Sequence, residues 1–167
     1  MRREIHLTVT YPHPIDRVWA AISDSTALSA WFMPNDFEPR LGHRFTFRAK
    51  PAPGFDGVVH AEVTELEPPR VLGMSWRGGP LATTHVWFRL TPVEDGTRLD
   101  LEHTGFAGPR GVLLSFLFSG GWPRLLRSKL AGHLDGVTDP EHKGEMSSRR
   151  QRMIARLAAL PLSRRRP

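Results

Sequence analysis

The sequence contains no cysteine, which excludes disulfide bonds, a thiol nucleophile and any cysteine-based zinc site. Long hydrophobic runs are also absent: the longest apolar stretch, residues 112–118, is far shorter than the ~20 residues that span a bilayer. The N-terminal segment turns polar too early to form the apolar core of a signal peptide. We therefore expect a cytoplasmic protein. Its 167 residues suit one globular domain with an appendage.

Familiar catalytic motifs are missing as well. The sequence has no HExxH, Walker loop, GxSxG elbow or dinucleotide-binding glycine pattern. Its acidic–histidine cluster, Asp135, Asp139, Glu141 and His142, fits no metal-loop spacing and is typical of a solvated turn. The sequence thus predicts no cofactor and no metal, and it assigns no catalytic residue.

Net positive charge is confined to the C-terminal segment. Residues 143–167 hold eight basic side chains against Glu145 alone, whereas residues 1–142 hold 15 basic and 16 acidic ones. A nearly neutral body argues against a nucleic-acid-binding surface. We expect residues 137–167 to form a basic extension with a helix near 145–160. That helix could pack on its own domain, form a dimer contact or lie on an anionic membrane.

The sequence does contain regular alternation of apolar and polar residues, the period of half-buried strands. Proline and glycine turns separate the segments, and such short connections favour an antiparallel meander. Two short helices, residues 15–22 and a second one reaching Trp31 with Asp24 in its capping segment, are predicted after the first strand. The predicted strands are residues 4–11, 44–48, 57–66, 71–77, 83–92 and 97–106.

A longer helix is predicted over residues 122–134. Its apolar residues recur at helical spacing, so they form one broad face, and the apolar face of the sheet is the large surface available to cover it. The apolar stretch 112–118 that precedes this helix has two interpretations. It packs as part of the approach to the helix, or it forms a lid hinged at the flanking glycines.

Several short motifs, in this order, resemble the helix-grip superfamily that includes START domains, the birch-pollen allergen fold and polyketide cyclases (SRPBCC). Within it, the chain is similar to the branch of activator of Hsp90 ATPase homologues (AHSA-type). The resemblance implies an α+β helix-grip fold over residues 1–136: a curved antiparallel sheet of about six or seven strands around a long C-terminal helix. The motifs are Pro14–Ile22, Trp31–Pro34, Phe37–Pro39, Gly42 with Phe45, Glu65–Pro68, Leu72 with Trp76, Gly96–Leu99, His103–Phe106 and Gly121–Trp122.

Such a fold encloses apolar side chains between sheet and helix, either as a packed core or as the lining of a ligand pocket. His103 has the apolar parity of its strand, and a buried histidine is more often hydrogen-bonded for structure than a general base. The predicted pocket residues are Phe45, Phe47, Val59, Met74, Trp76, Val86, Phe88, Leu101, His103, Trp122 and Leu126.

Three functions remain open on this evidence. The one we favour is non-enzymatic binding of a small hydrophobic or aromatic molecule in the sheet–helix cavity. A second is a cyclase or hydrolase that uses His103 in the same pocket. A third is a co-chaperone-like interaction module, with a chaperone or a second copy of the chain as partner.

Overall fold

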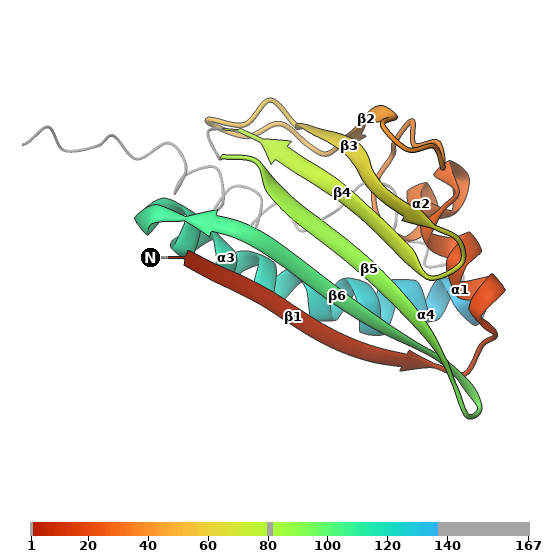
Figure 1. Ribbon diagram of the computed structural model, residues 1–167. Coiled ribbons are helices and arrows are strands. Elements are labelled where there is room, and N and C mark those ends of the chain that lie inside the picture. Colours follow the sequence, from red (N-terminus) through yellow and green to blue (C-terminus); the bar gives the residue numbers. More distant parts are fainter. Residues whose placement is uncertain (1, 80–81, 137–167) are drawn as a thin grey trace, which may run out of the picture.

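In the computed structural model, which describes residues 2–79 and 82–136, a six-stranded sheet carries its helices on one face (Figure 1). Every pair of neighbouring strands is antiparallel, in the order β1-β6-β5-β4-β3-β2. This is the predicted α+β helix-grip fold, with six strands. The elements are β1 (Arg2–Tyr11), α1 (Ile15–Ile22), α2 (Ser25–Trp31), β2 (Arg44–Arg48), β3 (Val58–Glu67), β4 (Val71–Gly78), β5 (Thr84–Val93), β6 (Gly96–Ala107), α3 (Gly108–Arg124), the π-helical segment η1 (Leu125–Leu130) and α4 (Ala131–Leu134).

Alternation along each strand gives the sheet two different faces. Successive side chains of a strand point to opposite sides, and along β5 the buried Val86 and Phe88 alternate with the half-exposed His85 and Trp87. The inner face, which meets the helices, is therefore apolar, and the outer face is polar. The six predicted strands are confirmed, with their ends shifted by two residues at most.

The two short helices that follow β1 are also confirmed. Asp24 caps α2, because its carboxylate accepts a hydrogen bond from the Ala27 amide at 2.8 Å. The Trp31 indole at the end of α2 donates to the Ala21 carbonyl oxygen in α1 at 2.8 Å. This buried bond holds the two helices together.

The C-terminal helix corrects one prediction. It begins at Gly108, not at residue 122, so the stretch 112–118 is part of α3 itself and is not a loop lid. Apolar residues at a spacing of four run through the whole helical stretch and point it at the sheet: Leu114, Phe118, Trp122, Leu126, Leu130 and Leu134. Pro123 interrupts the helix interior, where it supplies no amide hydrogen to the preceding turn. The π-helical segment η1 follows directly.

A buried tyrosine ties the end of β1 to this irregular segment. The Tyr11 hydroxyl donates to the carbonyl oxygen of Leu126, in η1, at 2.7 Å. Burial raises the pKa of Tyr11 far above its ordinary value, so the hydroxyl stays protonated and remains a hydrogen-bond donor. A side chain that bonds into the helix ladder is a common companion of such irregularities.

Helix α3 lies over one side of the sheet. Its backbone approaches β1 and β6 most closely, whereas β2, β3 and β4 are farther from it (Figure 1). Among the described residues, no helix has the length and apolarity needed to cross a membrane. The predicted basic extension, 137–167, with its helix near 145–160, lies outside the described residues.

Candidate functional site

An aromatic cluster occupies the space between the inner face and α3. We use this name for Phe32, Trp76, His103, Phe106, Phe118 and Trp122, which come from the end of α2, from β4, β6 and α3. The Phe32 and Trp122 rings are stacked with centroids 5.7 Å apart, and Phe118 meets Trp76 edge-on at 6.4 Å. Both arrangements are favoured geometries for aromatic pairs.

A β-bulge explains how His103 and Phe106 both enter this cluster. Strict alternation would place residues three apart on opposite faces, yet both are buried on the inner face. The register with β1 shifts at this point, because Ile5 lies opposite His103 while Arg3 lies opposite Phe106. The extra residue is absorbed at Gly105, whose φ of 95° favours glycine. The two rings therefore meet at 4.5 Å.

His103 is the centre of a chain of buried hydrogen bonds. The Trp122 indole nitrogen, which only donates, lies 3.1 Å from Nδ1 of His103. Nδ1 is therefore the acceptor, and Nε2 carries the proton that faces the Thr84 hydroxyl oxygen at 2.9 Å. Thr84 in turn donates to the Trp76 carbonyl oxygen at 3.2 Å. Every polar group in this series of hydrogen bonds therefore has a partner.

The electrostatics of the site keep His103 neutral. Burial, with a smaller contribution from the nearby charge of His85, lowers the pKa of His103 from 6.5 to about 3. A general base needs a free lone pair, and the lone pair of Nδ1 is held by Trp122. The arrangement is that of a structural histidine.

The predicted pocket residues all lie buried between the sheet and the helices. Phe47 and Trp76 are neighbours at 5.3 Å, and His103 contacts Trp76 and Trp122 at 6.4 and 6.0 Å. That these residues line a ligand pocket stays a prediction.

Sequence reasoning missed four residues of the site: Phe32, Thr84, Phe106 and Phe118. Thr84 has the inward parity of β5, and Phe118 continues the spacing of four in α3, so both carried a readable signal. Phe32 follows the end of α2, and the bulge decides the side of Phe106. Helical or strand periodicity therefore could not predict that either ring joins the cluster.

The sequence profile described as "Activator of Hsp90 ATPase homolog 1-like protein" matches residues 12–135. The chain belongs to this family. The resemblance found in the motifs is thereby confirmed. No match is found among curated proteins.

Solved structures of the same fold include several bacterial members. Protein MLL2253 from Mesorhizobium loti is 32% identical, with a TM-score of 0.72 over 82% of this chain and 99% of that one. CalU16 from Micromonospora echinospora is 27% identical, with a TM-score of 0.66 over 94% and 89% of the two chains. DynU16, at 24% identity and a TM-score of 0.66, covers 79% of this chain and 47% of its own, and shows the fold alone.

One group of side chains has the composition of a metal site. Ligand atoms of Glu4, His6 and Glu102 lie within 4.8 Å of one another on the outer face of β1 and β6. Glu102, however, pairs with Arg89 at 2.7 Å. A carboxylate neutralised in this way is a poor ligand for a cation, so we describe the group as an ion-pair network.

Proposed function

We propose that this protein binds a small apolar or aromatic molecule between the inner face of the sheet and α3. The observation that carries the proposal is the aromatic cluster with its fully paired hydrogen-bond chain. A molecule entering there would meet ring faces and edges and no unpaired charge. Sites of this kind are mostly apolar with a few fixed polar groups.

The path of entry is suggested by Phe118. Its ring is half-buried and touches His103 and Phe106 at 5.1 and 5.6 Å, so it closes the cluster towards solvent. The strands β2–β4 lie farther from the α3 backbone than β1 and β6 do, and the rings of Trp76 and Phe118 meet across that wider space. We expect a ligand to displace the Phe118 ring and occupy part of this space.

Two further observations favour binding over the alternatives. A cyclase or hydrolase would need the lone pair of His103 that Trp122 occupies. A co-chaperone surface would be broad and apolar, whereas the large hydrophobic residues exposed in the described part of the chain are Leu41, Leu113 and Phe116.

The test uses the full chain and N-phenyl-1-naphthylamine, a neutral dye whose emission rises in apolar surroundings. We expect saturable binding to wild type. Val59→Phe, on the inner face of β3, should weaken it at least tenfold by filling the space. Val58→Phe adds the same ring to the outer face one residue away and should bind the dye like wild type.

Folding is checked for both variants by circular dichroism and urea denaturation. If Val59→Phe does not fold, Phe118→Ala provides the second test, since removal of the outermost ring should tighten dye binding. Equal affinities for wild type, Val59→Phe and Val58→Phe would show the proposal to be wrong. Native mass spectrometry of the purified chain would reveal a molecule that co-purifies.

A further inference from the structure

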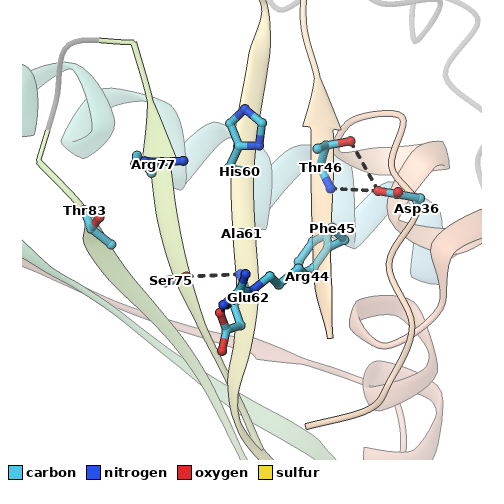
Figure 2. Close-up of a pocket in the computed structure, with 10 residues that line it drawn as sticks. All are labelled: Asp36, Arg44, Phe45, Thr46, His60, Ala61, Glu62, Ser75, Arg77 and Thr83. Carbon is cyan, nitrogen blue, oxygen red and sulfur yellow. Dashed lines mark hydrogen bonds and ion pairs between the residues drawn. The ribbon is translucent and has the colours of Figure 1, made fainter. Parts of the chain in front are cut away.

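We propose that the outer face of the sheet carries a second binding site, for a small organic anion with a carboxylate or phosphate group. A groove of about 450 Å³ lies over β2, β3 and β4, on the side away from the helices (Figure 2). This site is separate from the proposed apolar one, because the thickness of the sheet lies between them.

Strand register arranges the polar residues of the groove in two rows. In one row, Thr46 lies opposite His60, and His60 lies opposite Arg77. In the other, Arg44 lies opposite Glu62, and Glu62 lies opposite Ser75. Figure 2 shows the first row as side chains from three neighbouring strands along the same end of the groove.

The charged groups of the second row and of the rim already have partners. Arg44 pairs with Glu62 at 3.1 Å, although solvent exposure makes this pair weak. The Asp36 carboxylate accepts hydrogen bonds from the Thr46 amide at 2.7 Å and from its hydroxyl at 3.3 Å. The hydrogen bond from the Thr46 amide is the main reason that the pKa of Asp36 lies below its ordinary value. Asp36 is therefore ionised and held at the edge of the groove.

Arg77 and His60, in the first row, lack such partners among the described residues. Three outward-facing arginines of the sheet, Arg44, Arg89 and Arg98, each pair with a carboxylate. Arg77 faces His60 and Thr83 instead. Within residues 2–79 and 82–136, the side chains of Arg77 and His60 form no hydrogen bond or ion pair. The groove therefore presents a permanent cation, the Arg77 guanidinium, and an imidazole with free hydrogen-bonding capacity.

These donors match one oxyanion group. A guanidinium offers a planar fork of N–H groups that bonds carboxylate or phosphate oxygens in pairs. The His60 ring and the Thr83 hydroxyl, both lining the groove, can complete the set of donors. The ionised Asp36 at the edge would repel a polymer with many charges. A single anionic group on a small molecule fits, and a nucleic acid does not.

The experiment compares three probes with the same ring: phenyl phosphate, benzoate and neutral benzyl alcohol. Titration of the full chain by isothermal calorimetry should show saturable binding of at least one anion and none of benzyl alcohol. Arg77→Gln should weaken anion binding at least tenfold. Arg98→Gln removes the same charge from the same face, at β6, and should change the affinity less than twofold.

The preferred anion identifies the head group. Three outcomes would overturn the proposal: no saturable binding of either anion, equal losses in Arg77→Gln and Arg98→Gln, or benzyl alcohol binding as tightly as the anions. Val59→Phe separates this site from the apolar one, since it should leave anion binding unchanged. A failure of dye binding to the inner face would leave these results unaffected.

Discussion

The two faces of the sheet are built from the same strands but stabilised in different ways, and two tryptophans show the difference. On the inner side, Trp122 is 2% exposed, stacks on Phe32 and donates to His103. On the outer side, Trp87 is half-buried, stacks on His85 and donates to Glu65 at 3.0 Å. Water can replace the partners of Trp87 but not those of Trp122. The face, more than the residue type, should therefore set the cost of a substitution.

The largest effect should come from Trp122→Ala. Removal of a fully buried aromatic side chain costs about 3–5 kcal/mol of the free energy of unfolding, and the loss also leaves Nδ1 of His103 without its donor. Trp87→Ala is the matched control and should cost about 1–2 kcal/mol, for one partly exposed hydrogen bond and a partial loss of packing. Urea denaturation measures both. Equal losses would break the comparison between the faces.

The second prediction concerns pH. His103 has a pKa of about 3 in the folded protein and 6.5 when exposed. Above pH 6.5 both states are neutral and the full stability is present. As the pH falls from 6.5 towards 3, only the unfolded chain takes up the proton, so stability should fall by roughly 1 kcal/mol per pH unit.

His103→Gln is the control for this effect, since glutamine has a donor and an acceptor but does not titrate. Its unfolding free energy should depend less steeply on pH between 6.5 and 4. Denaturation curves at several pH values give the two slopes. Identical slopes would mean that His103 is not the buried neutral group described above.

The third prediction tests the bulge that places Phe106 on the inner face. Gly105→Ala should destabilise the protein by about 1–3 kcal/mol, because alanine disfavours the φ of 95° and its Cβ would lie 3.1 Å from the Thr84 Cα. Gly121→Ala is the contrast: its Cβ meets nothing within 4 Å, and alanine is the better helix former. It should stabilise by roughly 0.5–1 kcal/mol. Thermal unfolding that shifts in the same direction for both would contradict this account.

The strands and the two faces of the sheet could be predicted from the sequence because they follow from alternation. The start of α3 could not, because Gly120, Gly121 and Pro123 are local signals for a break. The apolar residues spaced four apart along the helix pack against the sheet, and this packing outweighs those signals. The bulge at Gly105 could not be predicted from alternation either. It is defined by the pairing of β6 with β1, which the sequence of β6 alone does not give.

The smallest effect should come from the outer ion pair. Arg89 and Glu102 lie 2.7 Å apart, but their side chains are 43% and 31% exposed, so water and salt screen the attraction. A double-mutant cycle with Arg89→Gln and Glu102→Gln should give a coupling of about 0.2–1 kcal/mol that falls as ionic strength rises. A coupling above about 2 kcal/mol, insensitive to salt, would mean that this part of the outer face behaves like the interior. The difference in stabilisation between the two faces would then not hold for β5 and β6.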